Sequence, residues 1–128
     1  MSSPRQAAVW IDHHEARIFH VGAGGADVLI GAPHHHILRH SKDPRVEHRH
    51  PEDQRRFFHD VAAALHDAEQ ILVVGPSTAK LQLLRYLHEH APLVERKVVA
   101  VETVDHPTDR QLAAYVKEHF EPRPAEAR

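Results

Sequence analysis

The hydrophobic period of this chain changes near residue 51, and this change limits the possible folds more than any other sequence feature. Before that point, aliphatic residues gather in short runs such as 7–11, which is typical of strands. After it, apolar residues recur every three to four positions, as in Phe57, Val61 and Leu65, which is typical of amphipathic helices. Short apolar runs then return between the helical segments. The chain is therefore expected to join an antiparallel first part to a second part of alternating helices and strands.

Three strands are expected in the first part, over residues 7–11, 16–21 and 27–30. Four polar residues, 12–15, separate the first two apolar runs, which indicates a β-hairpin. Residues 22–25 include three glycines and predict a second turn, because glycine gives the backbone access to positive φ. The first part is therefore predicted to be an antiparallel meander.

Two further strands are expected over residues 71–75 and 97–102, and both are apolar on both faces. A helix is expected between them. Ser77 or Thr78 is predicted to cap this helix, and Pro92 is predicted to end it. A strand, a helix and a strand in this order predict a parallel pair with a right-handed crossover.

The other two helices have recognisable starts. Pro51 suits the first helical position, and Glu52 and Asp53 complement the positive end of the helix dipole. Thr108 and Gln111 have the spacing of a capping box, which predicts the start of the last helix.

The predicted order of elements is β-β-β-α-β-α-β-α. The arrangement that fits it is a three-layer α/β fold of the ribonuclease H-like class. Its mixed five-stranded sheet has the order 3-2-1-4-5, with strand 2 antiparallel and helices on both faces. Residues 1–120 are expected to form a single domain, and the Pro- and charge-rich residues 121–128 a disordered C-terminal tail.

The composition excludes several classes of protein. A sequence with no cysteine forms no disulfide, no thiolate metal site and no cysteine nucleophile. Its longest aliphatic runs, such as 71–74, fall far short of the roughly 20 residues that a membrane helix needs. The N-terminus carries no secretory pattern, so a cytoplasmic protein without a membrane partner is expected. The net charge of −2 predicts no general attraction to nucleic acid.

Histidine is the compositional outlier, with 15 residues in the chain. Six of them lie in residues 34–50, together with four basic and two acidic residues. A loop of this length in a compact domain is either functional or mobile. We expect its cations to contact RNA phosphates and its imidazoles to act as secondary donors or stacking planes; a solvated loop is the competing interpretation. The candidate RNA-binding residues here are Arg39, Lys42, Arg45, Arg49, His34, His35, His36, His40, His48 and His50.

Lys80 is a further candidate RNA-binding residue. It follows a predicted strand and opens a predicted helix, where free backbone N–H groups are able to hold an anion. A secondary phosphate contact is one interpretation, and simple helix capping is the other.

Catalytic and metal sites are less well supported. His48 and His50 would lie on one side of an extended chain, which makes a histidine metal site an alternative, but no thiolate or fixed acidic ligand accompanies them. Asp12 ends a strand as a two-metal nuclease requires, yet residues 71–78 contain no acid, so Asp12 is interpreted as a turn residue. No catalytic residue, resident metal or cofactor is therefore predicted.

Two stretches resemble the middle domain of archaeo-eukaryotic peptide release factors and Pelota, and bacterial release-factor-like "translational machinery" proteins. The first is the hairpin Val9-Trp10-Ile11-Asp12-His13-His14-Glu15-Ala16-Arg17-Ile18-Phe19. The second is the strand, Gly-Pro turn and lysine-bearing helix start Ile71-Leu72-Val73-Val74-Gly75-Pro76-Ser77-Thr78-Ala79-Lys80, where those relatives usually place a second glycine at Ser77. The resemblance covers residues 7–120 in order of elements and implies a ribonuclease H-like fold and a translation context.

In that family, the working loop lies between strand 3 and the first helix and carries a Gly-Gly-Gln tripeptide. Residues 31–50 of this chain have none, and its Gly24-Gly25 pair is followed by Ala26. Peptide release is therefore not expected, and the resemblance implies non-catalytic binding to ribosomal or transfer RNA. The alternatives are a homo-oligomeric or protein-interaction module, paired through the edge strand at 97–102, and a histidine-rich metal-binding protein.

Overall fold

The computed structural model describes residues 5–21, 28–30 and 51–120, with the backbone alone at 28–30 and 51–53. The elements in chain order are β1 (Gln6–Ile11), β2 (Ala16–Val21), β3 (Val28–Ile30), α1 (Pro51–Leu65), β4 (Gln70–Gly75), α2 (Ala79–His90), α3 (Pro92–Glu95), β5 (Val98–Thr103) and α4 (Asp109–Phe120). The expected mixed α/β fold is confirmed. The predicted turn at 22–25 and the predicted tail at 121–128 lie outside the described residues.

β1 is the central strand of a mixed sheet. It pairs antiparallel with β2, where Val9 lies opposite Ile18, and parallel with β4, where Val9 lies opposite Val73. β5 adds to β4 in parallel, with a register shift between Ile71 and Leu72, and β3 adds to β2 antiparallel. The sheet therefore has the order β3-β2-β1-β4-β5.

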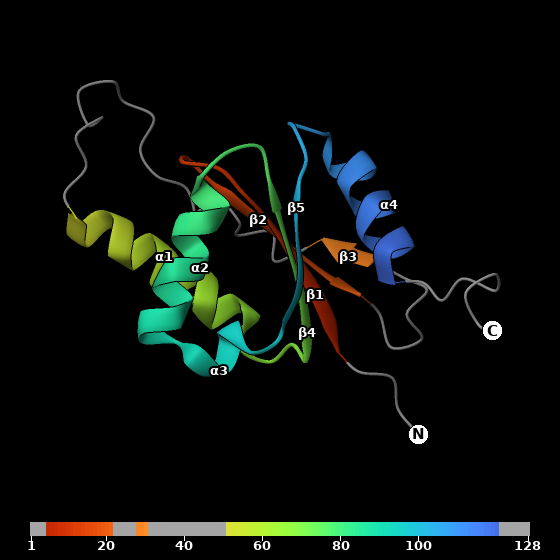
Figure 1. The fold of residues 1–128 in the computed structure, drawn as a ribbon. Helices are drawn as coiled ribbons and strands as arrows, with labels where there is room; N and C mark the ends of the chain where they lie inside the picture. Colours follow the sequence, from red (N-terminus) through yellow and green to blue (C-terminus); the bar gives the residue numbers. More distant parts are fainter. Residues whose placement is uncertain (1–4, 22–27, 31–50, 121–128) are drawn as a thin grey trace.

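Helices cover both faces of this sheet, as Figure 1 shows: α1, α2 and α3 lie on one side and α4 on the other. Because successive side chains of a strand point to opposite faces, β1 contributes to both cores. Val9 and Ile11 pack under α1 and α2, whereas Ala8 and Trp10 pack under α4. The three layers follow directly from this alternation.

The glycine that ends β4 lies tightly against the end of β1. A Cβ atom at Gly75 would overlap the backbone carbonyl of Ile11. The chain can therefore leave the sheet toward α2 at this position only because the residue has no side chain.

β5 corrects one expectation from the sequence. The strand was expected to be covered on both faces, but every second residue is exposed, including Val99 at 52% and Val101 at 39%. The reason is its place at the sheet edge, since the apolar faces of the helices pack mainly on β1 and β4. An apolar run alone did not show that helices leave one side of this strand exposed.

The two predicted caps have different outcomes. The capping box is confirmed: the Thr108 N–H donates to Gln111 Oε1 at 2.9 Å, and the Gln111 N–H donates to Thr108 Oγ1 at 3.1 Å. Thr78 is the N-cap of α2, but its side chain makes no capping hydrogen bond, so the expected side-chain cap is wrong there. Its hydroxyl lies 3.4 Å from His13 Nε2 instead.

Pro92 also differs from its prediction. It was expected only to end the middle helix, and α2 does end just before it, at His90. Pro92 then starts the short helix α3, which the sequence pattern did not show. In the part of the chain that the structure describes, no helix is long and apolar enough to cross a bilayer.

The two N-cap threonines form a matched pair for a stability test. Thr108→Ala removes a side-chain cap and is expected to lower the free energy of unfolding by about 0.5–2 kcal/mol. Thr78→Ala removes no capping hydrogen bond and is expected to cost less than about 0.5 kcal/mol. Urea denaturation followed by circular dichroism measures both. Equal losses in the two variants would contradict this account of the helix starts.

Candidate nucleic-acid interface

The predicted RNA-binding residues fall into two groups. Ten of them belong to the segment 34–50 and lie outside the described residues, as do His48 and His50 in their alternative role as metal ligands. Their contacts stay predictions. Lys80 is the member of the set that the structure places.

Lys80 lies in the first turn of α2 and is only 8% exposed. Its Nζ donates a hydrogen bond to the Ser77 carbonyl at 2.7 Å. The ammonium therefore stabilises the turn between β4 and α2. A contact of Lys80 with phosphate stays a prediction, and it would have to compete with this local bond.

Asp12 closes the hairpin between β1 and β2. Its Oδ1 accepts hydrogen bonds from the N–H groups of His14 at 2.7 Å and Glu15 at 2.8 Å. Its Oδ2 lies 3.6 Å from His106 Nε2, in the middle of the connection from β5 to α4. One oxygen of this carboxylate is thus used as the turn interpretation of Asp12 requires.

Trp10 and Arg17 fasten the connection between β5 and α4 to the hairpin. Trp10 Nε1 donates to the Asp105 carbonyl at 2.8 Å, and the Trp10 ring meets the His106 ring edge-on at 5.3 Å. The Arg17 guanidinium lies 4.3 Å from the centre of the indole ring and forms an ion pair with Asp109 at 2.7 Å. These contacts join the carboxyl ends of β1 and β5, the edge at which ligands commonly bind in α/β sheets.

This edge does not have the features of a metal centre. Over residues 5–21 and 51–120, no three or more His, Cys, Asp or Glu side chains are arranged to hold a metal ion. A neighbouring cavity of about 500 Å³ lies between the β5–α4 connection and α4. Its lining carries one acidic residue and no lysine or arginine: Val104, Asp105, His106, Pro107, Gln111, Leu112 and Tyr115. That charge does not suit a polyphosphate backbone.

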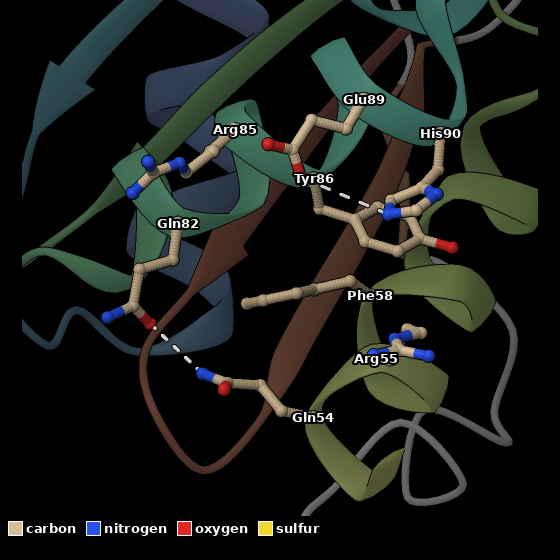
Figure 2. A pocket seen from close by; sticks show the side chains of 8 residues that line it. All are labelled: Gln54, Arg55, Phe58, Gln82, Arg85, Tyr86, Glu89 and His90. Carbon is tan, nitrogen blue, oxygen red and sulfur yellow. Dashed lines mark hydrogen bonds and ion pairs between the residues drawn. The ribbon is translucent and has the colours of Figure 1, made fainter. Parts of the chain in front are cut away.

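A second cavity, of about 330 Å³, lies between α1 and α2 (Figure 2). We call it the α1–α2 groove. Its lining residues are Gln54, Arg55 and Phe58 from α1, and Gln82, Arg85, Tyr86, Glu89 and His90 from α2. The groove begins at the amino end of α1, which directly follows the predicted RNA-binding segment in the chain.

The charge of the groove is positive. Arg55 and Arg85 stand against one acid, Glu89, whose Oε1 lies 3.9 Å from His90 Nε2. Within the described part of the chain, no hydrogen bond or ion pair engages either guanidinium. Both cations are therefore available to an anion, unlike Arg17, which pairs with Asp109.

Three rings form the other half of the groove. Phe58 and Tyr86 lie 5.8 Å apart, and Tyr86 and His90 lie 4.7 Å apart, both pairs tilted. Phe58 is 7% exposed and anchors the series in the core, whereas the His90 side chain is 50% exposed. Opposite the rings, Gln54 Nε2 donates to Gln82 Oε1 at 3.2 Å and joins the two helices (Figure 2).

Sequence reasoning missed this groove. It did not consider Arg55 or Arg85 as candidate binding residues. The positions 82, 85, 86 and 89 do follow the spacing of one helical stripe, and this signal was available. That two polar stripes from separate helices face each other depends on how α1 crosses α2, which the sequence pattern does not contain.

Comparison with known proteins points to translation factors. No protein-family profile matches the chain. The chain is 30% identical over 106 residues to the Pelota homologue of Thermococcus onnurineus, a stretch that covers 77% of this chain and 28% of that protein.

Solved structures show the same fold. Pelota from Archaeoglobus fulgidus matches with a TM-score of 0.63 at 20% identity, over 91% of this chain and 33% of that one. An archaeal translation termination factor, aRF1, matches with a TM-score of 0.60 at 14% identity, over 89% and 34%. The chain thus spans about a third of these relatives or less. The resemblance noted in the sequence is confirmed: the chain is a Pelota- and release-factor-like middle domain.

Proposed function

We propose that this domain is a non-catalytic, translation-associated protein of the cytoplasm that binds ribosomal or transfer RNA. The observation that carries the proposal is the similarity to the Pelota homologue, which extends over 77% of the chain. A structural relative is named as a translation termination factor. The proposal includes a ribonuclease H-like fold with the strand order 3-2-1-4-5. The strand pairing described above supports this assignment.

Binding rather than catalysis is proposed for two reasons. The sequence has no Gly-Gly-Gln, the tripeptide that the resemblance associates with peptide release. Asp12, the one strand-end carboxylate considered for a nuclease, accepts two backbone hydrogen bonds in its own turn. The domain would then act by occupying RNA, not by cleaving an ester or a phosphodiester.

The proposed contact surface combines the segment 34–50 with the α1–α2 groove. The segment carries four cations and directly precedes α1 in the chain, and the groove adds two more, Arg55 from α1 and Arg85 from α2. Neutralising phosphates with such cations releases counterions, so binding should weaken steeply as salt rises. Because the net charge of the whole chain is −2, RNA would be attracted only where cations cluster on the surface.

Cosedimentation with purified ribosomes tests the proposal. The wild-type protein is expected to pellet with ribosomes at low salt and to be released as salt rises. Reversing the four cations of the segment (Arg39→Glu, Lys42→Glu, Arg45→Glu and Arg49→Glu) should weaken binding by ~10²-fold or more and flatten the salt dependence. Equal binding by this variant, or no association of wild type at any salt, would refute the proposed interface.

A matched control reverses cations elsewhere on the domain. Arg96→Glu, Arg110→Glu and Lys117→Glu change the net charge in the same direction but lie outside the groove and the segment. This control is expected to retain most of the binding. If it loses as much as the segment variant, the attraction follows overall charge and not a defined surface.

A second candidate function is a homodimer paired through β5. The observation in its favour is the exposed apolar side of this edge strand, where Val99 is 52% and Val101 is 39% exposed. An edge strand offers unpaired backbone groups to a second copy. Such contacts depend little on ionic strength, unlike the proposed RNA contacts.

Light scattering after size-exclusion chromatography distinguishes the two candidates. The dimer hypothesis predicts twice the monomer mass at both low and high salt, and a monomer for Val101→Lys, because a charge would be buried at the interface. His66→Lys, which changes an exposed residue in the turn after α1, should leave the mass unchanged. A wild-type monomer at micromolar concentration would eliminate this candidate.

A further inference from the structure

The α1–α2 groove combines unpaired cations, free amide groups and a series of rings within one small cavity. We propose that it binds a single nucleotide of unpaired RNA, with the phosphate on the arginines and the base beside the rings and amides. This inference rests on the proposed RNA-binding function and adds to it a defined pocket and a requirement for an unstacked base.

The arginines supply the phosphate contact. Arg55 projects from α1 and Arg85 from α2, so the two guanidiniums flank the cavity from separate helices (Figure 2). A guanidinium presents a planar fork of donors that matches phosphate oxygens. Glu89 is the one acid of the lining and lies beside His90, so the two arginines leave the groove with a net positive charge. The groove therefore attracts an anion.

The amides supply contacts to a base edge. In the bond between the two helices, Gln54 uses one amide hydrogen and Gln82 uses its carbonyl oxygen. Gln54 Oε1 and Gln82 Nε2 remain as an acceptor and a donor on the outer sides of this bond (Figure 2). Base edges present donors and acceptors, and proteins read unstacked bases through such edges. A purely apolar or purely cationic ligand would not use this pair.

The rings supply the stacking surface. Phe58, Tyr86 and His90 form a tilted series that starts in the core and ends at an imidazole that is half exposed. A base placed beside His90 or over the cavity would extend the series outward. Stacking of bases on His, Tyr and Phe side chains is the usual way in which proteins bind single-stranded RNA.

The dimensions favour one unpaired nucleotide over a duplex. The cavity of about 330 Å³ lies near the lower end of the range for small-ligand pockets. A base in an A-form duplex remains stacked and is not offered to such a pocket. A nucleotide that enters it would also bring its neighbouring phosphates toward the amino end of α1.

Fluorescence anisotropy with a labelled single-stranded RNA hexamer tests the pocket. Tyr86→Leu, which keeps an apolar contact with Phe58, and Arg85→Gln, at an exposed position, are each expected to weaken binding by about 5- to 10-fold or more. Arg56→Gln is the matched control, because Arg56 is an exposed neighbour of Arg55 that does not line the groove, and it should change the affinity by less than about 2-fold. Unchanged binding in Arg85→Gln overturns the proposal, even if Tyr86→Leu proves less stable.

Competition identifies what the groove accepts. A mononucleotide should displace the hexamer weakly and an RNA duplex should displace it less than an unlabelled hexamer does. Displacement by inorganic tripolyphosphate or by a glutamate-rich peptide as effective as by the unlabelled hexamer would overturn the proposal, because neither offers a base. A mononucleotide as effective as the hexamer would assign the groove to free nucleotides instead of RNA.

Ribosome cosedimentation separates this inference from the function on which it rests. If Arg85→Gln and Tyr86→Leu bind ribosomes like wild type while the segment variant does not, the proposed function stands and the nucleotide pocket is wrong. If wild type binds the hexamer through the groove but does not pellet with ribosomes at any salt, the ribosomal role fails and the pocket stands. Loss in both assays, with circular dichroism spectra unchanged, supports both proposals.

Discussion

β1 is buried on both faces and paired along both edges, and the remaining elements are arranged around it. Residues 7 to 11 are fully excluded from solvent, and their side chains alternate between the core under α1 and α2 and the core under α4. A strand in this position must be apolar throughout, must have a parallel neighbour reached by a helix, and must turn at its end without exposing its backbone. At the carboxyl end of β1, the hairpin turn held by Asp12 lies on one side and Gly75 of β4 packs against Ile11 on the other, so the backbone is not left exposed there.

That carboxyl end is where many α/β proteins place their chemistry, and here its polar groups serve architecture. Trp10 and Arg17 tie the connection between β5 and α4 to the hairpin, and Asp12 holds the hairpin turn. A carboxylate at the end of the first strand is thus compatible with a turn as much as with a metal. The difference lay in its partners, which are two backbone N–H groups and a histidine.

Among the described residues, a groove with two unpaired arginines lies elsewhere, between α1 and α2. Its two arginines, two amides and three rings come from stripes that are unremarkable on each helix alone. The sequence identified the adjoining segment 34–50 from its composition, because clustered charge is visible without a fold. It did not identify the groove, because residues 54 and 82 become neighbours only when the helices pack.

The sequence by itself determined the elements other than α3 and their arrangement in layers. Hydrophobic period distinguished strands from helices, the Thr108–Gln111 box marked the start of α4, and the family motifs at residues 9–19 and 71–80 led to the relatives that comparison later confirmed. Tertiary structure decided that one side of β5 stays exposed, whether the Thr78 hydroxyl caps, and which polar side chains form a groove. The physical reason is range: periodicity and capping act within a few residues, whereas burial and groove formation depend on elements that are distant in the chain and adjacent in space.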